Sequence, residues 1–396
     1  MEAVIRKGQE NQADAKVIFA LFLVHFIGDF YASFINPLLP VLSGKLGLTL
    51  AQVGIVAGLS RFLAFIVQPS VGYLADHYRT RFFILGGPFL SILFIPLLGA
   101  ADSFALVLLF VALGSIGSAM FHPPAAGMVP VYAGRSPGLA MSLFNLGGTI
   151  SFAIGPLLVA WWVTHQGLEK LPYLSLFGLA VMVVLFILTP RPEGEGLKNL
   201  GFIGSLKEIF GSVWKQILII WILIVFRTFV SQSFMTFIPI LFMNEGHSLL
   251  SIGGMLSLYI TAAALSGVLA GHWADRIGYK PIFVGAYVLA TPCLYLFLHF
   301  KGALVYAGAF MAGFSILATM PLAVALAQEI APKGRSLVAS LMMGLAFGTG
   351  GILTPLTGML ADHYSIRTVL DVVLWIPLLA APLIWKLPER VRKSAA

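Results

Sequence analysis

Long apolar stretches alternate with short polar segments along almost the whole chain. A helix that spans a bilayer needs about 20 mostly apolar residues, and helices satisfy the backbone polar groups that hydrocarbon leaves without water. The short alternating strands of a membrane barrel are absent from this sequence. The pattern therefore predicts an all-α membrane protein with twelve transmembrane helices, at residues 17–41, 51–75, 82–100, 103–129, 137–164, 171–189, 216–243, 248–274, 282–300, 303–330, 336–361 and 368–386.

The longest polar stretch between two predicted helices lies near the middle of the chain and covers residues 190–214. Six predicted helices lie on each side of it. We interpret this stretch as a cytoplasmic linker that joins an N-terminal six-helix bundle at 1–189 to a C-terminal six-helix bundle at 215–396.

The two predicted bundles share sequence features at matching positions. The segments Gly72–Asp76 and Gly271–Asp275 both follow the pattern G-x-x-A-D. Pro40 and Pro239 are separated by the same number of residues as those two segments. Such repetition predicts two pseudo-symmetric bundles, an arrangement typical of membrane transporters.

Composition supports a location within lipid. Hydrophobic residues make up 59% of the chain, charged residues make up only 10%, and the mean hydropathy is +0.95. Soluble domains carry about 25% charged residues. The composition therefore excludes a cytosolic enzyme or a nucleic-acid-binding protein as the main role of the chain.

The basic residues indicate the orientation of the predicted helices and account for the net charge of +8. Cytoplasmic loops of membrane proteins carry an excess of Lys and Arg. With the N-terminus inside, most basic residues fall in cytoplasmic segments. We expect a multi-pass protein of the cell (inner) membrane with both termini in the cytoplasm. The exceptions are Lys45, Lys170, Lys301 and Arg367 in outer loops, and Arg61 and Arg227 within spans.

The first predicted span carries a polar stripe. His25, Asp29, Ser33 and Asn36 follow one another at steps of four, four and three residues, which places them on one helical face. A charged side chain in mid-membrane costs a few kcal/mol, so the stripe should face a watery cavity or a partner. We expect Asp29 to take part in proton exchange; the alternative is a structural salt bridge.

The second span carries Arg61 and Gln68 on one face. The guanidinium of Arg61 keeps its proton, so it must pair with a carboxylate or meet an anion. We expect Asp29 to be its partner, because spans one and two are joined by a short loop.

The seventh span carries Arg227, with Ser231 on the same face and Gln232 beside it. No carboxylate lies in this span. Two arginines and one aspartate would leave a central cavity with net positive charge, which suits an anionic substrate. The alternative for Arg227 is that its side chain extends to the cytoplasmic surface.

The fourth span contains Phe121-His122-Pro123-Pro124, and the fifth contains Asn145. A histidine can titrate near neutral pH, and span counting places His25 and His122 at similar depth. We therefore expect the two histidines to share one cavity. The alternative for His122 is a hydrogen bond to backbone that the prolines leave unpaired.

The repeated segment resembles the loop motif G-x-L-A-D-R-x-G-R-K of the major facilitator superfamily. The second copy, Gly271–Lys280, matches it well, whereas the first, Gly72–Arg81, has His77 and Arg79 in place of Arg and Gly. The resemblance covers the whole chain and implies a monomeric transporter of two six-helix bundles. It implies gating, by stabilising the outward-open state, for Gly72, Asp76, Arg81, Gly271, Asp275 and Arg276.

The element Phe121-His122-Pro123 also resembles the fosmidomycin-resistance branch of that superfamily, although Pro124 stands where the branch has glutamate. This resemblance implies proton-coupled export of small, often anionic, drug-like compounds, and hence antibiotic resistance.

No signature of an enzyme, a nucleotide site or a metal site occurs, so we expect no cofactor and no metal. We interpret the chain as a secondary active transporter that works by alternating access on a small-molecule substrate and protons in the lipid bilayer, without nucleic acid. Uptake of an organic anion by proton symport is the alternative. An intramembrane enzyme with His122 as base, or a sensor that binds ligand without moving it, are more distant rivals. The expected proton-coupling residues are Asp29, Arg61, His122 and His25; the expected substrate-binding residues are Arg227, Asn36, Gln68, Asn145, Gln232 and Ser231.

Overall fold

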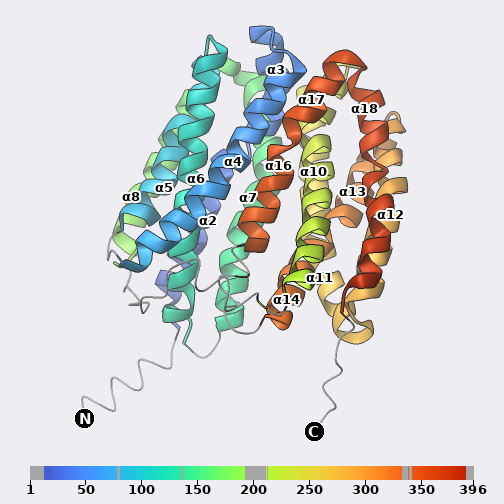
Figure 1. Ribbon diagram of the computed structural model, residues 1–396. Coiled ribbons are helices and arrows are strands. Elements are labelled where there is room, and N and C mark those ends of the chain that lie inside the picture. Colours follow the sequence, from blue (N-terminus) through green and yellow to red (C-terminus); the bar gives the residue numbers. More distant parts are fainter. Residues whose placement is uncertain are drawn as a thin grey trace, which may run out of the picture. The chain divides into compact units, whose positions relative to one another are not determined.

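A computed structural model describes residues 13–77, 81–134, 137–191, 211, 213–331, 338 and 341–388. All regular structure in these residues is helical, and no strand occurs among them (Figure 1). Twelve segments are long and apolar enough to cross a membrane, and they match the twelve spans predicted from the sequence. The all-α prediction is therefore confirmed.

Contacts within the chain divide it into two compact units. Unit 1 comprises residues 1–47 and 63–197, and unit 2 comprises residues 48–62 and 198–396. The start of the second span thus packs with the C-terminal part of the chain, although the sequence assigns it to the N-terminal bundle. Helix α4, Leu50–His77, begins in unit 2 and continues into unit 1.

Unit 1 is built around α2, which packs against α5, α6, α7 and α8, while α5 also packs along α6. Figure 1 shows these helices in blue to green. Their bounds are α2 Ala15–Ala32, α3 Ile35–Leu46, α5 Phe82–Phe94, η1 Pro96–Ala100, α6 Phe104–Tyr132, α7 Pro137–Gln166, η2 Leu168–Tyr173 and α8 Leu174–Leu188.

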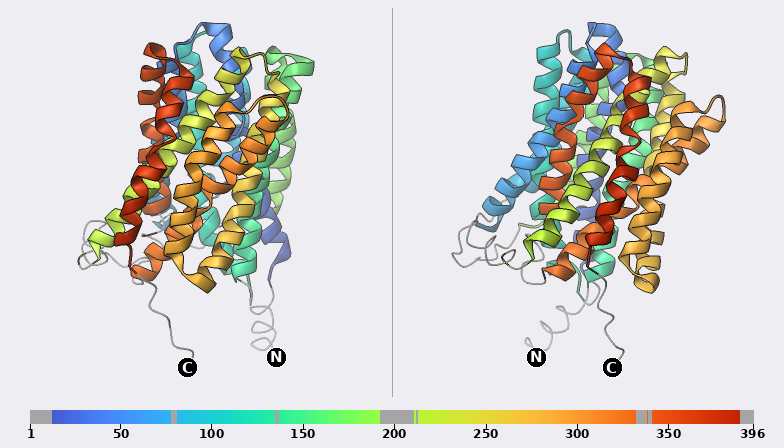
Figure 2. Two further views of the ribbon diagram at one scale, coloured as in Figure 1. Left: turned by 90° about the vertical axis from the view of Figure 1, so that its right-hand side faces the viewer. Right: turned by 45° about the vertical axis from the view of Figure 1, so that its right-hand side comes forward.

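Unit 2 repeats this plan with α10 in contact with α11, α13, α14 and the segments of the last two spans. Figure 2 shows its helices in yellow to red from two sides. Their bounds are α10 Trp214–Asn244, α11 Leu249–Ile277, α12 Tyr279–His299, α13 Leu304–Leu317, α14 Thr319–Ile330, the π-helical turn η3 Leu341–Ala346, α16 Phe347–Ile352, α17 Thr354–His363, α18 Ile366–Val373, α19 Ile376–Ala380 and η4 Ala381–Lys386.

Several spans are interrupted near prolines. The first span breaks between α2 and α3 at Ser33 and Phe34, and Pro37 cannot donate the backbone hydrogen bond that would satisfy the carbonyl of Ser33. The tenth span breaks at Ala318, where Pro321 has the same effect on the carbonyl of Leu317. Both breaks put backbone acceptors within the spans, where side chains can reach them.

Close packing of α11 and α13 depends on Gly313. A Cβ atom at Gly313 would overlap the backbone oxygen of Tyr259, and backbone cannot yield as a flexible side chain can. We expect Gly313→Ala to destabilise the protein by about 1–3 kcal/mol, the usual effect of overpacking. Thermal unfolding of the detergent-solubilised protein would report this as a lower Tm.

The matched control is Gly285→Ala in α12, because no described atom lies within 4 Å of a Cβ built there. We expect its Tm to stay unchanged or rise slightly, since alanine favours a helix over glycine. Equal Tm values for the two variants would contradict the packing argument.

Candidate functional site

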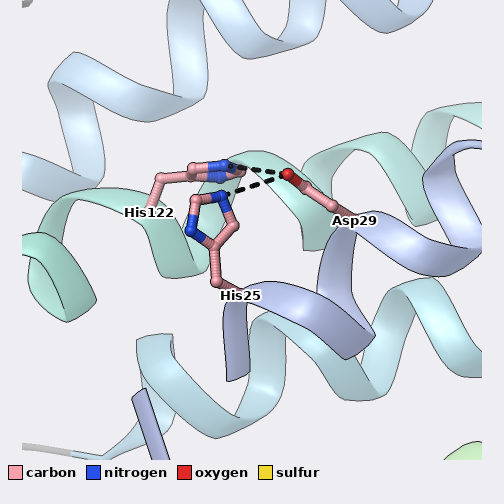
Figure 3. A group of neighbouring side chains, drawn as sticks. All are labelled: His25, Asp29 and His122. Atoms are coloured by element: carbon pink, nitrogen blue, oxygen red, sulfur yellow. Dashed lines mark ion pairs between the residues drawn. The ribbon is translucent and has the colours of Figure 1, made fainter. Parts of the chain in front are cut away.

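A cluster of three titratable side chains lies inside unit 1. His25 and Asp29 come from successive turns of α2, and His122 comes from α6 (Figure 3). The Nε2 atoms of His25 and His122 lie 3.2 Å and 3.5 Å from the same oxygen, Oδ2 of Asp29. Asp29 is 5% exposed and His25 is 7% exposed, so water screens these charges poorly.

The opposite nitrogen of each imidazole is bound to the backbone. Nδ1 of His25 lies 2.8 Å from the carbonyl oxygen of Phe144, and Nδ1 of His122 lies 2.6 Å from that of Ser118. A carbonyl oxygen only accepts hydrogen bonds, so Nδ1 of each histidine must carry a proton. The tautomer of both rings follows from these two contacts.

These contacts determine how many protons the two imidazoles and Asp29 need in order to attract one another. A neutral imidazole with its proton on Nδ1 presents a lone pair at Nε2, which would face the lone pairs of Asp29. Attraction at both contacts therefore requires an additional proton at each Nε2···Oδ2 pair. One ligand atom from each of the three residues lies within 4.8 Å of the other two, a spacing that metal sites and proton-sharing clusters have in common.

Two neighbouring residues, Ser118 and Gly148, support the cluster. The Ser118 hydroxyl donates a hydrogen bond of 3.1 Å to Oδ1 of Asp29, which is the oxygen that the histidines leave unoccupied. A Cβ atom at Gly148 would overlap Nε2 of His25, so this glycine makes room for the ring beside α7. A signal for Ser118 existed in its position one helical turn before His122.

A buried cation occupies unit 2. Arg227 in α10 is only 4% exposed, and its Nε donates a hydrogen bond of 3.1 Å to the carbonyl of Ile316. The alternative that this side chain extends to the surface is thereby excluded. Its Nη1 is buried without a hydrogen-bond partner, and no described carboxylate forms an ion pair with it.

Tyrosines surround this arginine. The phenols of Tyr259 and Tyr287 lie close enough to Arg227 to interact with its charge. Tyr259 shares a hydrogen bond of 3.0 Å with Ser231, one turn further along α10, and Tyr287 donates to the carbonyl of Leu223. Ser231 thus lies near Arg227, as the sequence predicted, whereas the tyrosines were missed because they come from other spans.

The two buried sites use equivalent backbone positions. Ser118 and Ile316 each lie five residues before a proline, Pro123 in α6 and Pro321 in α14. In each half this carbonyl accepts a hydrogen bond from a nitrogen of a basic side chain.

The remaining predicted binding residues differ in exposure. Gln232 is 6% exposed in unit 2, Asn36 and Gln68 are half-buried, and Asn145 is exposed. Arg61 lies in unit 2, where its guanidinium is 4.6 Å from the centre of the Phe347 ring. Its predicted pairing with Asp29 would join the two units and stays a prediction.

The gating motif is described only in part. Arg81 donates a hydrogen bond of 3.1 Å to the carbonyl of Phe186, and Arg276 is exposed. No described atom lies within 4 Å of a Cβ built at Gly271, so the described residues show no close helix approach at this glycine. The side chains of Asp76 and Asp275, and the surroundings of Gly72, lie outside the described part.

Charged residues buried within twelve apolar helices that are long enough to cross a membrane are typical of membrane transporters. The family model of the Major Facilitator Superfamily matches residues 21–355 and 220–396. The chain belongs to this superfamily, whose members are transporters and not enzymes.

Individual proteins are also similar to this chain along most of its length. The fosmidomycin resistance protein of Escherichia coli (strain K12) is 29% identical over 96% of this chain and 94% of its own length. The uncharacterized MFS-type transporter YfnC of Bacillus subtilis (strain 168) is 26% identical over 92% of this chain and 90% of its own. A bacterial homologue of the human lysosomal transporter Spinster has the same fold, with a TM-score of 0.79, 17% identity, and coverage of 93% of this chain and 96% of that one.

Proposed function

We propose that this protein exports small anionic, drug-like compounds across the cell (inner) membrane in exchange for protons, by alternating access. The observation that carries the proposal is the cluster of His25, Asp29 and His122: Nδ1 of each imidazole binds a backbone carbonyl, so each ion pair at Oδ2 of Asp29 needs a further proton. The similarity to a fosmidomycin resistance protein supports export and a role in antibiotic resistance. Both termini would lie in the cytoplasm, and the monomer would be the working unit.

The geometry suggests which groups carry the protons. Asp29 stays ionised in this arrangement, because Ser118 donates a hydrogen bond to its Oδ1 and the two imidazoles form ion pairs at its Oδ2. The imidazoles then carry the exchangeable protons. Loss of a proton from either ring turns an attractive contact with Asp29 into a repulsive one, which changes the relative stability of two conformations.

The surroundings of Arg227 support an anionic substrate. Burial of the unpaired Nη1 of Arg227 is unfavourable unless a ligand supplies an acceptor. A planar guanidinium binds carboxylate and phosphonate groups in bidentate fashion. We propose that the substrate's acidic group binds Arg227, with Ser231 and Gln232 nearby, and that Asn36, Gln68 and Asn145 contact the rest of the substrate.

Flux measurements in sealed vesicles test the proposal. The purified protein is reconstituted in liposomes with a trapped pH-sensitive dye, a pH gradient is imposed, and candidate anionic compounds are added. We expect substrate and protons to move in opposite directions. Movement in the same direction would favour symport of an organic anion, and substrate flux that ignores the gradient would overturn proton coupling.

A further inference from the structure

The cluster of His25, Asp29 and His122 has the side chains of a metal site as well as those of a proton site. Two imidazole nitrogens and one carboxylate oxygen are ligands that zinc and similar ions bind readily in proteins. All three residues belong to unit 1, so their arrangement is internal to one compact unit. No metal was expected from the sequence, because the third ligand comes from a different helix and completes no motif of fixed spacing.

The spacing of the three ligand atoms suits one tetrahedral ion. Zinc lies about 2.0–2.1 Å from a histidine nitrogen and about 2.0–2.2 Å from a carboxylate oxygen, so two ligands of a tetrahedral site are about 3.3–3.5 Å apart. Oδ2 of Asp29 lies 3.2 Å from Nε2 of His25 and 3.5 Å from Nε2 of His122. The planes of the two rings are inclined at 80°, and Figure 3 shows both rings directing a nitrogen at the carboxylate. An ion between these atoms therefore needs only small shifts of the side chains.

Hydrogen bonds outside the cluster already orient all three ligands. Metal-binding histidines almost always donate their second ring N–H to a carboxylate, a carbonyl or water. Nδ1 of His25 and Nδ1 of His122 each donate to a backbone carbonyl, so the neutral form of each ring presents the lone pair of Nε2 to an ion. The Ser118 hydroxyl binds Oδ1 of Asp29 and leaves Oδ2 facing the rings. The outer hydrogen bonds that a metal site requires are thus in place.

A divalent ion also matches the charge of the cluster. Under the proposed function, each imidazole carries an additional proton beside the Asp29 carboxylate, and the three residues together have one net positive charge. One divalent ion bound by two neutral imidazoles and the same carboxylate gives an equal net charge. The exchange of one ion for two protons is therefore balanced and leaves no uncompensated charge inside unit 1.

The donor atoms favour a transition-metal ion. Magnesium and calcium ions prefer sites built from oxygen atoms, whereas imidazole suits zinc, copper, nickel and iron. Zinc accepts the tetrahedral spacing, and three protein ligands leave its fourth position for water. The His122 side chain is 28% exposed, which leaves the cluster accessible on the side of this ring.

We infer that this cluster is a binding site for a divalent transition-metal ion such as zinc, coordinated by Nε2 of His25, Nε2 of His122 and Oδ2 of Asp29. The bound ion takes the place of the two coupling protons, so zinc inhibits exchange driven by a pH gradient. This inhibition rests on the proposed function, whereas binding of the ion rests only on the geometry of the three side chains.

Calorimetric titration with zinc tests the site directly. The purified full chain, free of any histidine tag, is titrated with zinc chloride in buffers of different ionisation enthalpy, which gives the number of protons released. We expect one ion per chain, two protons released for each ion bound, and a higher Tm with zinc present. Magnesium at concentrations that saturate the site with zinc should give no binding heat. Equal affinity for magnesium and zinc, or no binding of zinc, would overturn the inference.

The variant His122→Gln removes one of the three ligands. We expect its zinc affinity to fall more than about 100-fold, because loss of an outer partner alone typically costs about 10–100-fold. The matched control is His165→Gln in α7: His165 is exposed, and its Nδ1 contacts the carbonyl of Trp161 one turn earlier, as Nδ1 of His122 contacts that of Ser118. This control should keep the affinity of the unmodified protein. Equal zinc affinities of the two variants would place the ion elsewhere and overturn the assignment.

X-ray absorption by the zinc-loaded, unmodified protein identifies the ligands without any variant. We expect a spectrum with two imidazole ligands, completed by oxygen. A spectrum with one imidazole or none would overturn the inference.

Failure of the proposed function gives a different result from failure of the metal site. Zinc that binds through two imidazoles but releases no protons would contradict the proposed proton coupling and leave the metal site standing. Gradient-driven exchange that proceeds normally in liposomes, with a protein that binds no zinc, would leave proton coupling standing and overturn the metal site.

Discussion

Asp29→Asn should abolish transport driven by a pH gradient and spare counterflow exchange. An amide has the shape of the carboxylate but no charge, so it cannot stabilise imidazolium rings at His25 and His122. The protonated and deprotonated forms of the cluster then no longer differ in their interaction with residue 29, and the gradient has no means to bias the conformations. Uptake of labelled substrate into proteoliposomes, with and without a pH gradient, measures both activities.

Asp102→Asn is the matched control, because Asp102 is exposed in a loop of the same unit. We expect this variant to transport like the unmodified protein. Gradient-driven transport at the normal rate in Asp29→Asn would rule out the cluster as the coupling site, and loss of counterflow as well would assign Asp29 a structural role.

Arg227→Gln should weaken the binding of anionic substrates and at the same time raise the Tm of the ligand-free protein. Loss of a buried charged partner typically costs about 3 kcal/mol of binding, which corresponds to an affinity roughly 100-fold lower. The same substitution removes a buried cation that lacks an acceptor at Nη1, and this relieves an unfavourable term in the free protein.

Thermal unfolding with and without substrate separates this role from a structural one. A structural arginine would give a lower Tm on substitution, and that outcome would contradict a ligand site. Arg227→Lys keeps the charge without the planar fork, so we expect an affinity between those of the other two proteins. An uncharged analogue of the substrate should bind Arg227→Gln and the unmodified protein equally.

The twelve spans could be predicted because hydropathy depends on sequence alone. Steps of four residues likewise placed His25 and Asp29 on one face of α2, and their contact follows from helix geometry. The breaks at Ser33 and Ala318 could not be placed in the same way, because a proline can bend a helix without ending it.

Contacts between residues of distant spans could not be predicted from the sequence, for a physical reason. The rotation of a helix about its axis is determined by packing, which one sequence does not reveal. Arg61 is an example: its contacts with Phe347 and Gly351 were not predicted, and its expected pairing with Asp29 stays a prediction. Asp362 binds backbone more than 300 residues away, and backbone N–H groups leave no signature in a sequence.

The equivalent carbonyls of Ser118 and Ile316 suggest how the two halves have diverged. One ancestral position has come to bind a histidine beside an acid in the first half and an arginine without an acid in the second. Under the proposed function, the first half binds protons at this position and the second half binds an anionic substrate. Substitutions around the anion site of the second half can then change which compound binds, while the proton site of the first half is preserved. A single mechanism can therefore serve chemically different compounds.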